Sequence, residues 1–313
     1  MKRSNTFWIG AVAVLALSLL LALSGINEYF FFAGFVVLQF VVFATAWNIL
    51  GGYAGYVNFG TAAFVGVGAY TAVLLFKSLQ APLLLQLLAA GVVGGLLGFA
   101  TGLLTLRLRG IFFAIATVAI IVIMETVVMN WRYVGGAAGV QLLRPPVQEP
   151  FTSYTRMLFV VMTILAVFAV SVARYIQVSW IGRGLRAVRD SEEAAESCGV
   201  PTLKLKLFSC TISGALMATA GAPLAMYLSF VEPASSFNLN YSVSTLAMAM
   251  IGGTAHWIGP VIGALLLGSI QQAVTVTISS ENNVLVVGVL LVLFVVVAPD
   301  GVIGLWRRYV GRK

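Results

Sequence analysis

Charged residues are scarce in this chain of 313 residues, of which Asp, Glu, Lys and Arg together make up only 9%. An ordinary soluble domain carries about a quarter. A water-exposed surface cannot be built from so few charges, and the mean hydropathy is +1.02. Hydrophobic residues, at 60% of the chain, instead suit segments that cross lipid as helices bonded within themselves. The composition therefore excludes a soluble globular protein and predicts an integral membrane protein.

Metal ligands and nucleotide-binding signatures are also missing. The single histidine, His256, has no cysteine or carboxylate at metal-ligand spacing, so no metal site is expected. The two cysteines, Cys198 and Cys210, fall in or beside a basic segment assigned to the cytoplasm, and we expect free thiols. The sequence contains no GxGxxG and no Walker A motif, so we expect neither catalysis nor nucleotide binding by this chain.

Long apolar runs fill most of the sequence and predict an all-α, polytopic transmembrane bundle forming one domain over residues 1–313. About ten spans are expected, at approximately 7–24, 29–50, 54–76, 82–106, 111–131, 157–176, 206–229, 242–254, 258–279 and 284–299. The eighth run is short for a span. The first run, which follows Lys2 and Arg3, has a cleaved signal peptide as its competing interpretation.

Basic residues give the chain a net charge of +8, and they gather at the ends of the apolar runs. This placement indicates topology and contact with lipid head groups rather than nucleic acid. If the N-terminus lies inside, alternating spans place most of the 18 Lys and Arg in the cytoplasm. Both termini are therefore predicted to be cytoplasmic.

Small and polar residues inside the spans suggest packing faces and a transport path. Overlapping small-xxx-small spacings in the fourth run predict close helix packing and comprise Gly91, Gly94, Gly95, Gly98 and Gly102. Glu125 is the only acid well inside a predicted span, and it could serve a proton or an ammonium group or have a structural role. Asn58, Thr61 and Tyr70, assigned to the third span, are either substrate-path residues or partners in helix-helix hydrogen bonds.

The longest polar region, residues 177–206, is the predicted cytoplasmic segment. Asp190 is expected to cap a two-turn helix whose residue Glu193 reaches back, and Gly199 and Pro201 are natural stop signals. So short a helix must pack against something, either a partner protein or the same chain. Arginine recurs at every third position before it, which places one basic face against a partner or against anionic lipid: Arg183, Arg186 and Arg189.

Glu193-Ala194-Ala195, followed by Gly199, resembles the EAA signature of ABC importer permeases. Further stretches resemble the branched-chain amino-acid permease family over roughly residues 45–306. They are Gly51-Gly52-Tyr53-Ala54-Gly55, Phe59-Gly60, Gly66 to Thr71, Leu106 to Gly110, Ala114 to Thr117, Ile251-Gly252-Gly253, Gly259-Pro260, Gly263-Ala264 and Ala298 to Gly301. Thr61 departs from the histidine that many members of the family carry, and this departure leaves the substrate open.

The resemblance implies a permease subunit of a bacterial ABC importer in the inner membrane, for branched-chain or similar small amino acids. Its partners would be a second permease in a heterodimer, cytoplasmic ATPases that bind the ATP, and a periplasmic binding protein. By the same likeness Glu193, Ala194, Ala195 and Gly199 would form a coupling helix that docks on the ATPase, with Arg189 beside it. The alternatives are an ion-coupled secondary transporter, which would need several charged groups at mid-membrane, and a scaffold protein.

Overall fold

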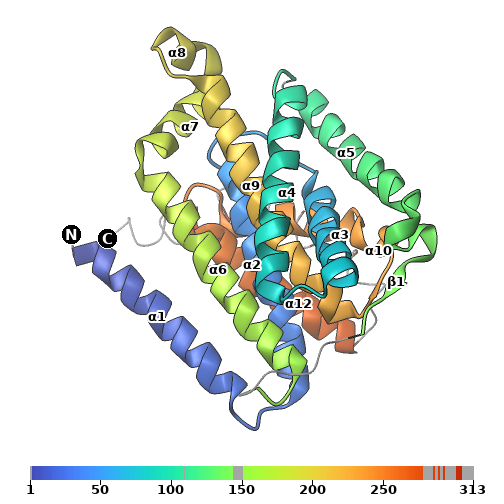
Figure 1. Cartoon of the computed structure of the whole chain (residues 1–313). Helices are drawn as coiled ribbons and strands as arrows, with labels where there is room; N and C mark the ends of the chain where they lie inside the picture. The colour runs from blue at the N-terminus through green and yellow to red at the C-terminus, as the bar shows by residue number, and fades with distance from the viewer. Residues whose placement is uncertain are drawn as a thin grey trace.

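The computed structural model is an all-helical bundle with one small strand pair (Figure 1). It describes residues 2–108, 110–143 and 151–277, the isolated positions 285, 288, 289 and 292, and residues 301–304, without the side chains of 2–5. The long helices are α1 (Lys2–Ala22), α2 (Glu28–Leu50), α3 (Thr61–Leu79), α4 (Leu83–Thr105), α5 (Ile111–Met129), α6 (Tyr154–Val178), α9 (Thr202–Leu228) and α12 (Ile258–Thr277). The shorter elements are α7 (Trp180–Asp190), α8 (Glu192–Ser197), α10 (Pro233–Ser236), α11 (Asn240–Gly252), the 3-10 turns η1 (Arg132–Val134) and η2 (Gly136–Ala138), and the antiparallel strands β1 (Val140–Gln141) and β2 (Phe230–Val231).

Seven described helices are long and apolar enough to cross a membrane, namely α2 to α6, α9 and α12. The apolar part of α1, Thr6–Ala22, is shorter than these seven helices, and α11 has only 13 residues. A helix of that length rises about 20 Å, less than the roughly 30 Å hydrocarbon layer. The tenth expected span, 284–299, lies outside the described residues apart from four isolated positions.

The expected start of the third span at residue 54 is wrong, because α3 begins at Thr61 and residues 51–60 form a loop. Glycines at positions 51, 52 and 55 weaken a helix here, and Gly55 has a φ of +80°. The loop turns back against α2, since the indole Nε1 of Trp47 donates to the carbonyl of Asn58 at 2.7 Å. The chain therefore re-enters the bundle before α3 starts.

The expected glycine face in the fourth span is confirmed by the packing of α4 on α9. A Cβ on Gly94 would overlap Ala218, and a Cβ on Gly98 would lie 2.6 Å from the carbonyl oxygen of Cys210. Only glycine permits this approach of one helix backbone to another. Figure 1 shows α4 and α9 side by side along the bundle.

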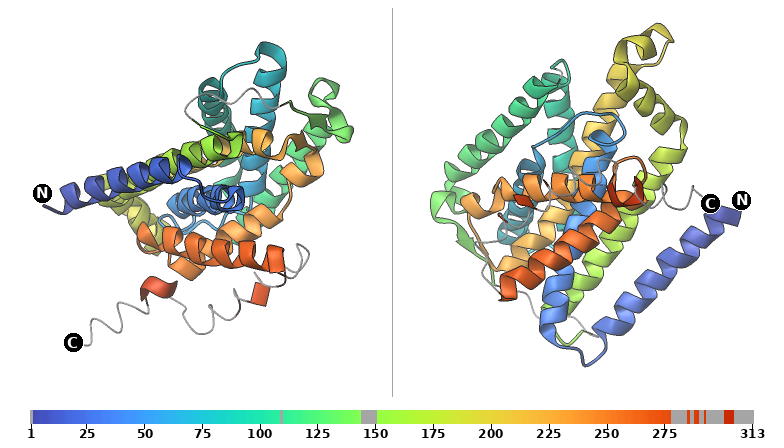
Figure 2. Two further views of the ribbon diagram at one scale, coloured as in Figure 1. Left: turned by 90° about the horizontal axis from the view of Figure 1, so that it is seen from below. Right: turned by 180° about the vertical axis from the view of Figure 1, so that it is seen from behind.

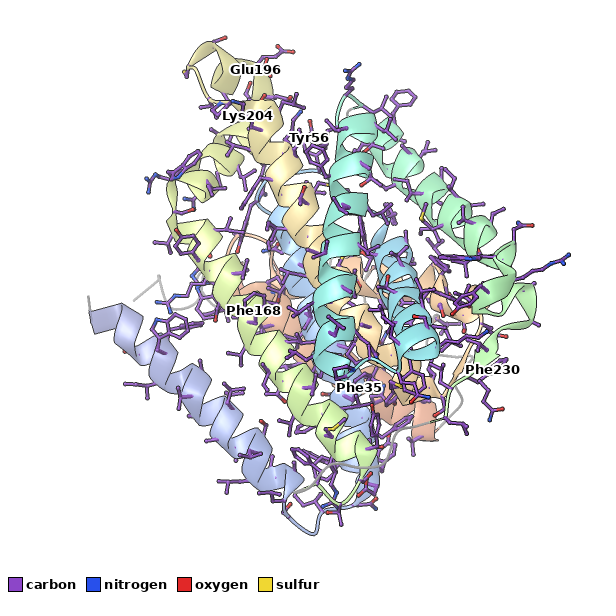
Figure 3. All side chains as sticks on the ribbon, viewed as in Figure 1. Phe35, Tyr56, Phe168, Glu196, Lys204 and Phe230 are labelled. Carbon is purple, nitrogen blue, oxygen red and sulfur yellow. The ribbon has the colours of Figure 1, made fainter. Side chains whose placement is uncertain are left out.

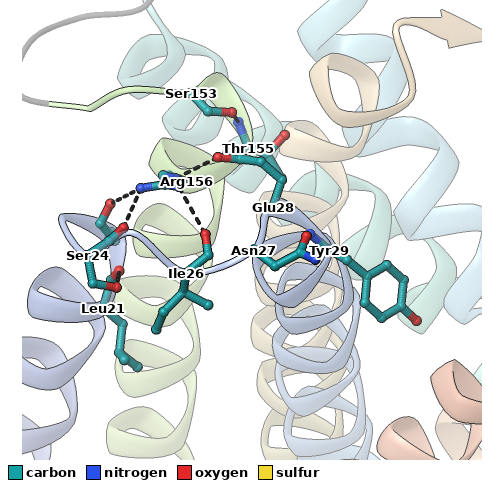
Figure 4. Close-up of polar contacts among 10 residues, drawn as sticks. Leu21, Ser24, Ile26, Asn27, Glu28, Tyr29, Ser153, Thr155 and Arg156 are labelled. Atoms are coloured by element: carbon teal, nitrogen blue, oxygen red, sulfur yellow. Dashed lines mark hydrogen bonds and ion pairs between the residues drawn. The ribbon is translucent and has the colours of Figure 1, made fainter.

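The turn between α1 and α2 is fixed by Arg156, in the first turn of α6 (Figure 4). Its guanidinium donates to the carbonyls of Ala22, Ser24 and Ile26 and pairs with Glu28 at 2.7 Å. Both views of Figure 2 show α1 beside α6, at the margin of the bundle. Arg156 therefore attaches this peripheral helix to the core.

The N-terminal ends of α3 and α11 meet inside the bundle. The chain leaves β2, passes α10 and enters α11, where Ser242 Oγ accepts the amide of Ala62 at 3.0 Å. Just before this point the ring of Phe237 stacks on Tyr70 at 6.0 Å. The loop before α3 and the segment before α11 thus bring two helix starts to one place.

Candidate coupling site and transport path

The predicted cytoplasmic segment forms a helical projection at one end of the bundle. Helices α7 and α8 follow α6 and return to α9, and Figure 1 shows α8 as the outermost element there. Figure 3 places Glu196 and Lys204 at this end, with Tyr56 lying further in. Apolar residues of α7 turn inward, since Leu185 and Val188 are buried. The segment is therefore helical and packed on its own chain.

The capping residue of α8 differs from the expectation, because Ser191 caps the helix and Asp190 is the last residue of α7. Ser191 Oγ accepts the amide of Ala194 at 3.3 Å. Both residues can accept at a cap, and the extended backbone of Ser191 is what ends α7 before α8 starts. The expected stop is confirmed, with Gly199 at a φ of +81°, a left-handed conformation that favours glycine.

The predicted coupling residues divide into an outer and an inner set. Glu193, Ala194 and Gly199 are exposed, whereas Ala195 is 5% exposed and packs on the chain. The two acidic residues in the first turn of α8 suit the positive end of its dipole. The exposed set offers a small, partly acidic surface to a partner.

Arg189 joins this projection to the loop before α3. Its Nη1 donates to the carbonyl of Gly52 at 2.8 Å. The expected basic face is confirmed, because Arg183, Arg186 and Arg189 are all exposed on α7. Of these, Arg189 contacts a residue more than a hundred positions away.

The sequence interpretation missed Glu192 and Lys206. Lys206 lies on α9, is 3% exposed and pairs with Glu192 at 2.5 Å. The sequence analysis treated Lys206 only as part of the polar segment 177–206. Lys204, two positions earlier, also has a leucine on either side and is exposed, so the neighbouring residues give no signal that marks Lys206 as buried.

The four substrate-path residues do not form one cluster. Asn58 belongs to the loop rather than to a helix, and its Oδ1 accepts the amide of Gly60 at 2.7 Å. Thr61 opens α3, and Tyr70 lies nine positions further along that helix, against Phe237. Glu125 lies on α5, partly exposed, about 6 Å from the C-terminal end of that helix. Only Asn58 and Thr61 share one site, where α3 and α11 start.

Several buried polar atoms have no hydrogen-bond partner among the described residues, although such atoms are rare in folded proteins. Thr61 Oγ1 and the Tyr70 hydroxyl are two of them. The others include Thr45, Asn48, Ser213, Ser236 and Thr245. Unpartnered hydroxyls on α3 and α11 are able to accept or donate to a polar solute.

Metal chemistry finds no support among the described residues, which hold no cluster of three potential ligands. Cys198 is exposed, Cys210 is buried, and both are free thiols. His256 accepts the amide of Ile258 through Nδ1 at 3.3 Å, and so has a local structural role.

Comparison with known proteins gives the family. Residues 29–295 match the family described as branched-chain amino acid transport system / permease component. The chain belongs to this permease family. This permease is 27% identical over 297 residues to the high-affinity branched-chain amino acid transport system permease protein LivM of Salmonella typhimurium, covering 87% of this chain and 69% of the relative.

Two further relatives support the same family. LivM of Escherichia coli is 26% identical over 297 residues, with 87% of this chain and 69% of the relative covered. The probable branched-chain amino acid transport permease protein LivH of Methanocaldococcus jannaschii is 25% identical over 268 residues, with 80% and 84% covered. No solved structure matches this permease at a significant level. It is a multi-pass membrane protein with at least seven apolar helices of spanning length among its described residues.

Proposed function

We propose that this chain is the transmembrane permease subunit of a bacterial ABC importer in the cell inner membrane. Its cargo is a branched-chain or similar small amino acid. The match to the permease family over residues 29–295 carries this proposal. The exposed residues Glu193 and Ala194 on the projecting helix α8 support it from the geometry.

In this proposal the α7–α8 end of the bundle faces the cytoplasm, both termini lie on that side, and residues 1–313 form one permease domain. A second permease completes a heterodimer. Cytoplasmic ATPases bind and hydrolyse the ATP, and a periplasmic binding protein delivers the cargo at the opposite end. This chain needs no cofactor of its own, and lipid surrounds its apolar faces.

Transport is then mechanical. Closure of the ATPases displaces α7 and α8, and the attached helices switch between outward-open and inward-open states. The exposed part of α8, namely Glu193, Ala194 and Gly199, docks on the ATPase. Arg189 and buried Ala195 hold the projection to its own chain.

Co-purification tests the proposal. The detergent-solubilised chain is isolated from its native membrane, and wild type is compared with Glu193→Lys and Ala194→Arg, which change exposed positions of α8. Lys204→Met is the matched control, because Lys204 is exposed on the neighbouring helix α9. We expect an ATPase and a second permease with wild type and the control, and loss of the ATPase alone from the two α8 variants.

A transport assay then defines the cargo. The complex is reconstituted in vesicles with its binding protein, and uptake of labelled leucine, isoleucine and valine is measured with and without ATP. ATP-dependent uptake supports the proposal. Uptake that follows an ion gradient and needs no ATPase would favour an ion-coupled carrier instead.

A further inference from the structure

The ammonium of Lys206 is buried where three parts of the chain meet. Its Nζ donates to the hydroxyl of Tyr56 at 3.1 Å, to the carbonyl of Leu106 at 3.3 Å and to Glu192 Oε1 at 2.5 Å. A lysine ammonium has three donors, so these acceptors satisfy all of them. Lys206 is only 3% exposed, and a buried ammonium is tolerated when it is paired and fully hydrogen-bonded.

Tyr56, Glu192 and Lys206 form a closed ring of hydrogen bonds, in which each side chain contacts the other two. The hydroxyl of Tyr56 accepts from Lys206 and donates to Glu192 Oε2 at 2.8 Å. The aromatic ring of Tyr56 lies edge-on to Phe113 in the first turn of α5, with centroids 5.2 Å apart. The loop of residues 51–60 is thereby joined to α5, to α9 and to the first residue of α8.

Arg189 contacts the same loop a few residues earlier, at Gly52 and Gly55. Besides its hydrogen bond to the carbonyl of Gly52, its side chain packs on Gly55, where an added Cβ would lie 3.0 Å from Arg189 Cγ. Helix α7 therefore holds one part of the loop while the Glu192–Lys206–Tyr56 ring holds another. The projection cannot be displaced without moving the loop or breaking these bonds.

The far end of the loop is fixed to the transport-path residues. The carbonyl of Asn58 accepts from Trp47, and the amide of Phe59 donates to Thr117 Oγ1 at 3.0 Å. Two residues into α3, the amide of Ala62 donates to Ser242 at the start of α11. Hydrogen bonds thus run from α8 through the loop to the place where α3 and α11 meet.

We propose that Lys206 is a positioning residue of the transport cycle: through Glu192 and Tyr56 it transmits the displacement of α7–α8 to the loop and to the first turn of α3. The inference rests on the proposed function, because the displacing force comes from the ATPase. Proximity alone does not establish energetic coupling between two sites, so the test must measure the coupling itself.

The test uses the double substitution Lys206→Met with Glu192→Leu. An apolar pair of similar volume is often accepted in place of a buried ion pair, whereas loss of one partner leaves an unpaired charge. The double variant is therefore expected to fold and assemble while lacking the ring. Lys204→Met, two positions away and exposed, is the matched control.

Two thiols report the two ends of the proposed connection in the complete importer. The native thiol of Cys198, exposed just after α8, reports the ATPase side. Val57→Cys, at a loop position that is 43% exposed, reports the loop in a Cys198→Ser background. Maleimide labelling rates at each thiol are measured without nucleotide and with a non-hydrolysable ATP analogue.

We expect nucleotide to change the labelling rate at Val57→Cys at least threefold in the intact chain and in the control, and to leave it unchanged in the double variant. Cys198 should respond in all three. Amino acid delivered per ATP hydrolysed should fall at least tenfold in the double variant only. A Val57→Cys response that survives loss of the ring, or that is missing from the intact chain, overturns the inference. A Cys198 thiol that never responds to the ATPase or its nucleotide would count against the proposed function instead.

Discussion

The guanidinium of Arg189 lies 2.8 Å from the carbonyl oxygen of Gly52, so the last turn of α7 holds the loop that leads into α3. A hydrogen bond from a charged donor contributes about 1.5 to 3 kcal/mol to the stability of the state that contains it. Because about 1.4 kcal/mol corresponds to a factor of ten in an equilibrium constant, Arg189→Met should lower uptake by about tenfold or more if the bond maintains coupling. Uptake by reconstituted vesicles measures the effect.

Arg183→Met is the control for Arg189, because Arg183 is exposed on the same face and, within the part of the chain that the structure describes, donates to nearby Val178 at the end of α6 rather than to the loop. It should keep uptake within about twofold of wild type. Equal losses in the two variants would show that the basic surface matters and the bond to Gly52 does not.

Arg156 should be a main contributor to stability at the α1–α2 turn. Arg156→Met removes the donors to three carbonyls and should lower the free energy of unfolding by about 3 kcal/mol. Thermal unfolding of the purified chain in detergent measures the loss. Glu28→Gln should lower the free energy of unfolding by less than about 1 kcal/mol, because the Glu28 side chain is 51% exposed and water screens its pair with Arg156. Equal losses would contradict this division.

The contact of α4 with α9 should not tolerate a side chain at Gly98. Gly98→Val places methyl groups against the carbonyl of Cys210, and backbone cannot yield as a flexible side chain does. We expect the free energy of unfolding to fall by about 3 kcal/mol or more, seen as poor yield and aggregation at a lower temperature on heating. Gly10→Val is the matched control on α1, where no atom of the described residues lies within 4 Å of an added Cβ. A Gly98 variant as stable as the Gly10 variant would contradict the packing.

The helical fold was readable from the sequence because lipid imposes long apolar runs, and the glycine face of α4 because close helix contact needs small residues. The start of α3 was misplaced, since residues 54–60 are apolar enough to extend a span and only the backbone shows the loop. Capping by Ser191 rather than Asp190 was likewise undetermined, because both types cap helices. The ring of Tyr56, Glu192 and Lys206 joins residues up to 150 positions apart, which no local pattern connects.

Alkaline pH should weaken the ring. Burial, and then the hydrogen bond to Glu192, raise the pKa of Tyr56 above its ordinary value of 10.0. The folded chain therefore holds the Tyr56 proton more tightly than the unfolded chain, and this stabilisation is present below pH 10 and is lost as pH rises through the folded pKa. Tyr56→Phe should show a shallower loss of stability than wild type above pH 10, measured by denaturant unfolding at several pH values. Identical slopes would contradict the assignment.

Thr61 should show opposite effects on stability and on transport. Its hydroxyl is fully buried and has no hydrogen-bond partner in the described ranges of the chain, which lowers stability by about 1 to 3 kcal/mol that an apolar group of the same shape would recover. Thr61→Val should therefore raise the thermal unfolding temperature. If the hydroxyl serves the cargo where α3 meets α11, the same variant should lower uptake several-fold at an unchanged amount of assembled complex. Thr71→Val, on the same helix but with its hydroxyl bonded to the carbonyl of Val67, should change uptake little. A Thr61→Val variant that is both more stable and fully active would remove Thr61 from the transport path, because an unsatisfied polar group that costs stability would then have no function to account for it.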